Sequence, residues 1–317
     1  MTIRSWLALI AVVVATSCRA GSDRTTSPPT VTTVARPSLA GKPVDGAECG
    51  TRPAPPPAYQ HVVWIFMENH RYDEVIDNTA APFETALAHR CGTATRYASV
   101  ASPSLPNYVG ATSGDTHGIA DDGGPAAHPL TADNLFRQVR SSGRQAHSYQ
   151  EAMPGSCALD SKGNYAVKHN PAAYYTGVDD RTACKHDDLA LGTPTSGSLA
   201  DALDHDTLGA FSFITPDLCN DTHNCDVATG DRWLQTWLPR LVASSAYRSG
   251  TTAIFVAWDE YTPMPSIVVS PSTPAGSVTD VAVDHYSLLR TTEELLGITD
   301  LLGHAARAPS MRPAFGL

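Results

Sequence analysis

The sequence predicts an α/β fold, with a mostly parallel central sheet, helices on both faces, and long loops over the carboxyl ends of the strands. Short apolar runs without Gly or Pro have the length and composition of buried strands. Segments with helical periodicity alternate with these runs, as parallel strands require. The three clearest runs are residues 61–67, 210–215 and 251–258.

The first run, 61–67, stops at the polar triplet Glu68-Asn69-His70. In open α/β sheets, ligands bind just beyond the carboxyl ends of the strands. Glu68 and Asn69 therefore place a carboxylate and an amide oxygen where a ligand is expected. The alternative is an ordinary strand-to-loop turn capped by Asn69, and this stretch alone does not choose between the two.

The remaining elements follow from capping residues and apolar faces. Pro at the start and good helix formers after it predict a helix over 82–88. One apolar face predicts a helix over 131–140, which Gly143 ends. An amphipathic helix is predicted over 230–245, despite Pro239. The other predicted elements are strands at 145–150 and 266–270 and a helix that opens at Asp284 and runs to Leu296.

Ser104 lies between two prolines, in the stretch Pro103-Ser104-Leu105-Pro106. Because proline restricts its own backbone and that of the preceding residue, we predict a rigid turn here and a helix from Tyr108. A hydroxyl on a stiff turn before a helix is exposed and close to amide donors, which is the setting that a nucleophile needs. The alternative is a serine that caps a surface turn.

Residues 152–203 show weak periodicity and contain several prolines and glycines. They predict a long excursion above the sheet, where specificity residues usually lie. Lys168 and His169 precede an Asn-Pro turn within it. A lone loop histidine is more often solvated than catalytic, so His169 becomes a candidate only together with other residues.

The N-terminal stretch has the pattern of an export signal. Arg4 precedes an apolar run that is too short to span a bilayer, so we expect residues 1–17 to be a signal peptide. The small residues that end at Cys18 resemble a bacterial lipobox, which implies a lipid anchor at the membrane of an exported protein; plain secretion is the alternative. We expect residues 18–58 to be a disordered tether, 59–303 the folded domain and 304–317 a C-terminal tail.

Charge and cysteine content bound the function further. The net charge is −10 without runs of Lys or Arg, which argues against nucleic acid as a partner. Apart from Cys18 the cysteines are even in number, which suggests three disulfides in an exported chain, with fifteen possible pairings. We expect neighbours in sequence to pair, as Cys49–Cys91, Cys157–Cys184 and Cys219–Cys225.

Two further predicted strands also end in polar residues. Parallel strands bring their carboxyl ends to one edge, so these residues are expected to converge with Glu68 and Asn69. Adjacent carboxylates repel each other unless a cation is shared. Their oxygen atoms suit Mg²⁺, Ca²⁺ or Mn²⁺, while histidines leave zinc or iron open. The residues are Asp217, Asp221 and His223 after 210–215, and Asp259 and Glu260 after 251–258.

Five short motifs follow one another in a specific order. They are Glu68-Asn69, Pro103-Ser104-Leu105-Pro106-Asn107-Tyr108, Pro216-Asp217 with Asp221-Thr222-His223, Trp258-Asp259-Glu260, and His285-Tyr286-Ser287. Over about residues 61–298 the chain resembles the bacterial phosphoesterase family, the secreted acid phosphatases and phospholipase C enzymes of the alkaline-phosphatase-like fold group. The Pro-Ser-x-Pro-Asn-Tyr form and the Lys-His-Asn-Pro segment are similar to the acid phosphatase branch, of which some members act on phosphatidylinositol 3-phosphate.

The resemblance implies roles for particular residues. Ser104 would be the nucleophile, while His169 and His223 would contact the phosphoryl oxygens or protonate the leaving group. Asn69 and Asn107 would also bind substrate. A divalent ion (Mg, Ca, Mn or Zn) would be held by Glu68, Asn69, Ser104, Asp259 and Glu260. Asp217, Asp221 and His285 would lie at a second metal or around the first. Some members carry Asp where this chain has Glu260, so its role as ligand or base stays open.

The function expected is that of an exported, metal-dependent acid phosphatase that hydrolyses phosphate monoesters, with phosphoinositides as candidate substrates, through a phosphoserine intermediate. Its partner would be a phosphorylated small molecule or a phospholipid headgroup. An acidic optimum would follow if His169 or His223 must be protonated. The alternatives are a phosphodiesterase of the phospholipase C type and a non-catalytic surface lipoprotein with a degenerate site.

Overall fold

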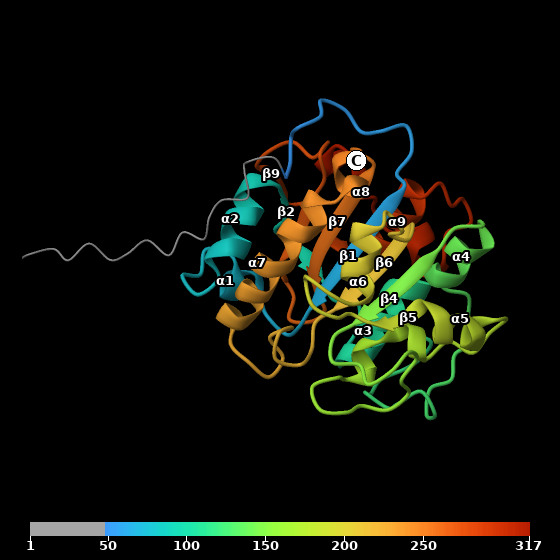
Figure 1. Cartoon of the computed structure of the whole chain (residues 1–317). Coiled ribbons are helices and arrows are strands. Elements are labelled where there is room, and N and C mark those ends of the chain that lie inside the picture. The colour runs from blue at the N-terminus through green and yellow to red at the C-terminus, as the bar shows by residue number, and fades with distance from the viewer. Residues whose placement is uncertain (1–47) are drawn as a thin grey trace, which may run out of the picture. The chain divides into compact units, whose positions relative to one another are not determined.

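A mostly parallel sheet runs through the part of the chain that the computed structural model describes, residues 48–317 (Figure 1). Within it, eight strands pair in the order β5-β4-β6-β1-β7-β8-β2-β9. β8 is antiparallel to both β7 and β2, and the other pairs are parallel. The strands are β1 (His61–Met67), β2 (Gly92–Ala94), β4 (Ala146–Gln150), β5 (Asp188–Ala190), β6 (Phe211–Thr215), β7 (Thr252–Trp258), β8 (Ser266–Val269) and β9 (Ser277–Thr279). The predicted α/β fold is confirmed.

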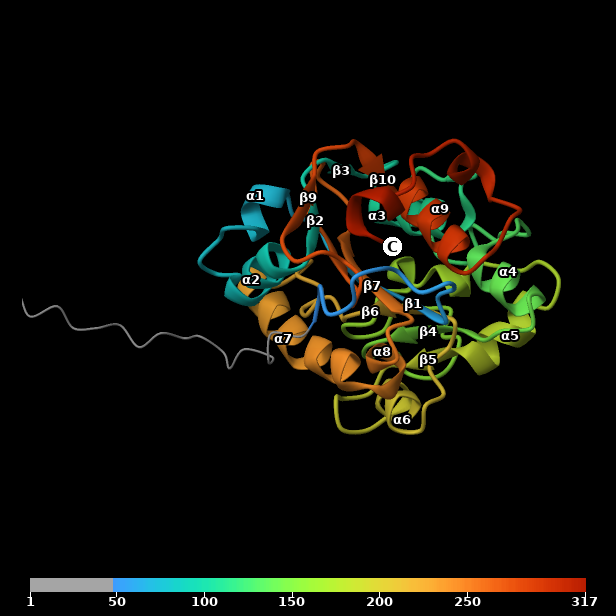
Figure 2. The same ribbon diagram turned by 90° about the horizontal axis from the view of Figure 1, so that it is seen from above.

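Helices cover both faces of this sheet, as Figure 2 shows from above. One face carries α2 (Pro82–Arg90), α6 (Ser198–Asp204), α7 (Val227–Ala243) and α8 (Ser245–Arg248). The other carries α3 (Ser104–Ser113), α4 (Leu135–Ser141) and α9 (His285–Leu295). The connections hold α1 (Tyr72–Val75), α5 (Asp180–Asp187), α10 (Arg312–Phe315), the 3₁₀ turns η1 (Val167–His169), η2 (Pro171–Ala173) and η3 (Gly303–Ala306), and the paired strands β3 (Tyr97–Ala98) and β10 (Val283–Asp284).

β1 is the centre of the sheet. It lies between β6 and β7, with Ile65 paired to Ile214 on one side and Val256 on the other. Residues 62–67 are completely buried. Because both faces of β1 are covered, successive residues must all be apolar, and the alternation of polar and apolar residues found in half-exposed strands is absent.

The predicted strands are confirmed, and helix ends differ where capping decides them. The helix expected from residue 131 begins at Leu135, because the Asn134 side chain accepts the Arg137 N–H at 2.9 Å and caps it. α7 begins at Val227 rather than Gly230, after the capping Asp226. Strands of two or three residues, such as β2, β3 and β10, were not predicted because so short a run carries no periodicity.

The C-terminal residues 304–317 were expected to be a tail, and the structure corrects this. They form η3 and α10, and they bury Ala305, Met311, Phe315 and Leu317 against the core. The Met311 N–H donates to the Thr291 hydroxyl of α9 at 2.8 Å. The buried apolar residues of this segment are separated by polar ones without a helical or strand period, so no sequence signal indicated that the segment packs against the core.

The end of the expected tether also belongs to the domain. Glu48 and Cys49 are buried, and the Cys49–Cys91 disulfide ties this segment to the end of α2. The pairings Cys157–Cys184 and Cys219–Cys225 are present as well, so all the expected disulfides within residues 48–317 are confirmed. The expected signal peptide, Cys18 and most of the tether lie outside the described residues.

No helix within residues 48–317 has both the length and the apolar content that crossing a membrane would require.

Replacing Phe315 with Ala tests the correction at the C-terminus. Phe315 is completely buried, and a Cβ built at Gly92 would lie 2.6 Å from its ring. We expect a loss of about 3–5 kcal/mol in the free energy of unfolding, measured by denaturant titration. Leu159→Ala, at a side chain that is 41% exposed, is the control and should cost less than about 1 kcal/mol. Equal losses would contradict a packed C-terminus.

Glu293 of α9 should make stability depend on pH. Burial raises the pKa of Glu293 to about 7, above the ordinary 4.5. Between these values the folded protein binds the proton more tightly than the unfolded chain does, so this contribution to stability is full below about pH 4.5 and is lost as the pH rises through 7. Glu293→Gln should remove up to about 3 kcal/mol of this pH dependence. Glu74→Gln, at an exposed carboxylate on α1, should leave the unfolding profile unchanged.

Candidate active site

Three strand ends meet at one edge of the sheet, as the sequence predicted. Glu68 follows β1, Asp221 lies beyond β6, and Asp259 follows β7. The backbone ties them together, because the Glu68 N–H donates to the Asp221 carbonyl at 2.8 Å and the Asp259 N–H to the Met67 carbonyl at 3.1 Å. All three acidic side chains are completely buried.

Ser104 joins this cluster from α3. Its Oγ donates to Glu68 Oε2 at 3.3 Å, and the side chain is almost fully buried. We expected a turn here with the helix beginning near Tyr108, but Ser104 is the first residue of α3. Proline is tolerated in the first turn, where the N–H has no helical partner, so Pro106 does not prevent the helix. The hydroxyl therefore stands at a helix N-terminus beside a strand end.

The side chain of Asn107, which the sequence suggested as a substrate contact, bonds to backbone groups. Its Oδ1 accepts the Val100 and Ala101 N–H groups, both at 2.9 Å, and its Nδ2 donates to the carbonyls of Ala101 and Pro103. These bonds use its full hydrogen-bonding capacity. Asn107 instead holds the loop that presents Ser104.

His169 lies between two of the acids. Its Nε2 is 3.2 Å from Glu68 Oε1 and its Nδ1 is 3.2 Å from Asp221 Oδ2. The ring stacks on Tyr108, with 5.2 Å between ring centroids, and the Tyr108 hydroxyl donates to Glu68. The sequence made His169 a candidate only together with other site residues, and the structure encloses it among them.

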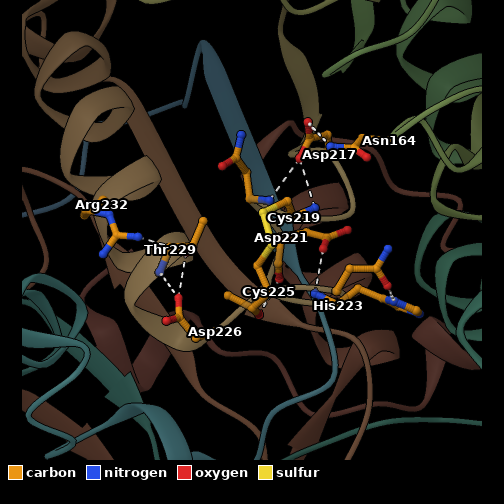
Figure 3. Close-up of a disulfide and its surroundings, with 12 residues drawn as sticks. Asn164, Asp217, Cys219, Asp221, His223, Cys225, Asp226, Thr229 and Arg232 are labelled. Atoms are coloured by element: carbon orange, nitrogen blue, oxygen red, sulfur yellow. Dashed lines mark hydrogen bonds between the residues drawn. A yellow bond between two sulfur atoms is a disulfide. The ribbon is translucent and has the colours of Figure 1, made fainter.

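The ring closed by Cys219 and Cys225 presents His223 and Asp221 (Figure 3). The His223 N–H donates to Asp221 Oδ1 at 2.8 Å. Asp217 accepts the N–H groups of Cys219 and Asn220 at 3.0 Å, so it shapes this ring rather than facing a second metal. The sequence did not show which way the Asp217 carboxylate points.

Three residues complete or support the cluster. Asn69 has a left-handed backbone (φ 53°), and its N–H donates to Asp259 Oδ1 at 3.1 Å. Glu260 accepts the Ser102 hydroxyl at 3.3 Å. His285 uses both ring nitrogens, bonding the Asp259 carbonyl at 2.9 Å and the Tyr97 hydroxyl at 2.8 Å. His285 therefore positions the end of β7 and has no nitrogen free for a metal.

Burial dominates the electrostatics of the site. Burial, then the charges of Asp259 and Asp221, raise the pKa of Glu68 well above its ordinary range. Burial also raises the pKa of Asp221 to about 8 and that of Asp259 to about 7. Burial lowers the pKa of His169 far below its ordinary value, which favours a neutral imidazole over the protonated one considered from the sequence.

The donor set fits a divalent cation. Glu68, His169 and His223 each offer a ligand atom within 4.8 Å of the others. Asn69 Oδ1 and Asp259 Oδ2 are buried without a hydrogen-bond partner among the described residues. A cation would neutralise carboxylates that burial otherwise pushes towards protonation. Carboxylate, amide and imidazole ligands are compatible with several metals, and they do not select one.

Sequence reasoning missed Tyr108 and Asp122 as site residues and assigned no role to Lys168. Tyr108 lies four residues after Ser104, so helical periodicity places both on one face of α3, and this signal was available. Asp122 lies in a loop rich in Gly and Asp, which carries no pattern. Its carboxylate reaches the site through the Leu105 N–H at 3.0 Å and Lys168 Nζ at 2.9 Å.

Residues 74–263, which include Ser104, His169 and Asp259, match the family model described as the phosphoesterase family. The chain belongs to this family. It is 27% identical over 270 residues to a phosphatidylinositol-3-phosphatase from Mycobacterium tuberculosis, covering 82% of this chain and 84% of that protein. It is 26% identical over 264 residues to an acid phosphatase from Aspergillus fumigatus, covering 77% of this chain but only 56% of that protein. This phosphoesterase is a phosphoric ester hydrolase.

Solved structures agree with this phosphoesterase in fold. A protein in the alkaline phosphatase superfamily from Vibrio parahaemolyticus matches with a TM-score of 0.55 and 11% identity, over 84% of this chain and 74% of that one. The lipoteichoic acid synthase LtaP from Listeria monocytogenes matches with a TM-score of 0.52 and 11% identity, over 84% and 78%. At this identity the likeness concerns the fold alone, and it confirms the alkaline-phosphatase-like architecture.

Adding a divalent ion should stabilise the phosphoesterase through Glu68. With the ion at about 100 times its Kd, we expect the midpoint of thermal unfolding to rise by about 5–10 °C. Glu68→Gln should abolish this rise, and it should unfold no earlier than the wild type in chelator, because the substitution removes repulsion among buried acids. Glu74→Gln, on the exposed surface of α1, should respond to the ion as the wild type does.

A scan of Mg²⁺, Ca²⁺, Mn²⁺ and Zn²⁺ by differential scanning fluorimetry makes the measurement. An equal rise for Glu68→Gln and the wild type would place the ion elsewhere.

Proposed function

We propose that this phosphoesterase is an exported, metal-dependent acid phosphatase that hydrolyses phosphate monoesters, phosphoinositides among them, through a phosphoserine intermediate on Ser104. The observation that carries the proposal is the position of the Ser104 hydroxyl, at the first residue of α3 and 3.3 Å from Glu68 Oε2, among buried acids. A non-catalytic role would not require so many buried charges to be kept together against their mutual repulsion.

The hydroxyl has a proton acceptor within reach. Glu68 Oε2 accepts the Ser104 hydroxyl at 3.3 Å. When bound, a divalent ion would lower the pKa of the serine hydroxyl and offset the charge of the phosphoryl group. Ser104 Oγ would attack phosphorus, its proton would pass to Glu68, and the bond to the leaving oxygen would break. Water would then cleave the phosphoserine, releasing inorganic phosphate and restoring Ser104.

His169 and His223 have different surroundings and are proposed to act differently. His169 is enclosed between acids and favours the neutral state, which suits a ligand or an acceptor. His223 is partly exposed, and its Nδ1 lies 2.8 Å from Asn224 Oδ1. We assign His223 to the phosphoryl oxygens and the leaving group, because it is more exposed than His169.

The proposed substrate class is supported by similar proteins, and the proposed export by the disulfides and the N-terminal sequence. Two similar proteins have phosphatase names, and one of these names a phosphoinositide. Disulfides persist in oxidising compartments, so the bridges within residues 48–317 support export. The signal-like sequence before Cys18 supports it independently, with lipid anchoring at Cys18 as part of the proposal.

Replacing Ser104 with Ala tests the nucleophile. We expect turnover to fall by about a thousandfold or more, while the thermal unfolding midpoint stays within a few degrees of the wild type. Phosphate release is measured on a panel of monoesters, phosphodiesters and phosphatidylinositol phosphates, with divalent ion or chelator. Acid quenching and mass spectrometry should find a phosphoryl group on Ser104 of the wild type.

Ser141→Ala is the matched control, because Ser141 is an exposed serine at the end of α4. Its turnover should equal that of the wild type. Undiminished turnover in Ser104→Ala would exclude Ser104 as the nucleophile. Release of a phosphorylated headgroup without free phosphate would instead support the phosphodiesterase.

A further inference from the structure

Lys168 brings a positive charge to a site lined with acids. Against the effect of burial, the charge of its ammonium lowers the pKa values of Glu68, Asp221 and Glu260. In turn, the carboxylates of Asp122, Glu68 and Asp259 favour the charged state of Lys168. It comes from η1, directly before His169, and its side chain is 20% exposed. A phosphate ester is an anion, so a protein of net charge −10 needs a local cation to attract it into such an acidic site.

In this structure that charge is already paired. Lys168 Nζ donates to Asp122 Oδ2 at 2.9 Å, and it lies 3.4 Å from His223 Nε2. The other carboxylate oxygen of Asp122 accepts the Leu105 N–H at 3.0 Å. Leu105 is the residue after Ser104. A single carboxylate thus joins the ammonium of Lys168 to the N–H group that follows the nucleophile in the chain.

The environment of Asp122 permits it to leave. Its side chain is 31% exposed, so it would be solvated once released. By contrast, His169 is 2% exposed and lies between Glu68 and Asp221, so it would stay in place when Asp122 leaves.

We propose that Asp122 occupies the phosphoryl-binding position of this site, and that a phosphate monoester enters by displacing Asp122 from Lys168. This inference rests on the proposed function and adds to it a substrate-selecting pair. Lys168 is the residue that binds the phosphoryl oxygens, and Asp122 is the internal anion with which the substrate competes.

The exchange favours monoesters on grounds of charge. A phosphate monoester carries a charge of about −1.5 to −2 near neutral pH, whereas a diester carries one negative charge. Displacing a carboxylate with a monoester therefore increases the negative charge facing Lys168, while displacing it with a diester leaves that charge unchanged. Lys168 and Asp122 together thus select the monoesters of the proposed phosphatase over the diesters of a phospholipase C.

Binding of inorganic phosphate tests the exchange directly, because it needs no turnover. The full chain is titrated with phosphate in a calorimeter, with the divalent ion that most raises the unfolding midpoint. Lys168→Met should weaken phosphate binding by about tenfold to a hundredfold, since a charge-assisted contact is lost. Asp122→Asn should strengthen it by about two- to fivefold, since the competing charge is removed. Lys168→Arg should restore most of the affinity.

Matched controls separate this effect from net charge. Lys162→Met and Asp160→Asn remove the same charges at exposed positions in the loop that leads to Lys168, and they should leave phosphate affinity unchanged. Thermal unfolding of every variant identifies any that fail to fold. If Lys168→Met is one of them, Lys168→Arg still allows the role of the charge to be measured. Weaker phosphate binding in both Asp122→Asn and Lys168→Met would overturn the competition, because Asp122 would then only position Lys168. Unchanged binding in Lys168→Met would overturn the role of Lys168.

Steady-state kinetics on a monoester and a diester of the same alcohol complete the test. Lys168→Met should raise KM for the monoester more than for the diester, and Asp122→Asn should lower KM for the monoester. Equal changes for both esters would overturn charge selection. If the wild type hydrolyses monoesters but the variants give any of these contrary results, only this inference is overturned. If the wild type releases phosphate from no ester, the proposed function itself is overturned.

Discussion

Burial of three carboxylates at adjoining strand ends is the constraint on which the site depends. Glu68, Asp221 and Asp259 cannot separate, because backbone hydrogen bonds hold the ends of β1, β6 and β7 side by side. Removing charges from water is costly unless they are paired or bind a metal. The raised pKa values of these acids express that cost. The central strand β1, apolar and completely buried over residues 62–67, supplies the rigidity to maintain so unfavourable a cluster.

The surrounding elements each offset part of this cost. α3 brings the hydroxyls of Ser104 and Tyr108 to Glu68, and η1 brings the ring of His169 between two of the acids. The same contacts that offset the burial of the acids also orient the groups proposed to react. Structural and chemical demands therefore coincide here, as expected of a site held on helices and strands rather than on loops alone.

Two partly exposed charges lie next to this buried cluster. The pair of Lys168 and Asp122 is partly exposed and connects a glycine-containing loop to the rigid cluster. Ion pairs of this kind contribute little to stability, so exchanging one partner for a ligand is inexpensive. The site thus combines a buried interior, which holds the nucleophile, with a partly exposed ion pair in which the substrate is proposed to replace Asp122. A protein of net negative charge gains from this arrangement a local cation for an anionic substrate.

The sequence alone determined the longer strands, most of the helices, the family and several of the residues that gather around Ser104. Apolar runs and capping residues act over a few neighbours, so they can be interpreted without coordinates. Only the tertiary structure decided which polar groups face the cluster: Asn107, Asp217 and His285 stand in the motifs yet support loops and strand ends, whereas Asp122 enters from a patternless loop. It also decided that residues 304–317 pack against the core. The direction of a side chain depends on partners distant in sequence, and local patterns carry no record of those partners.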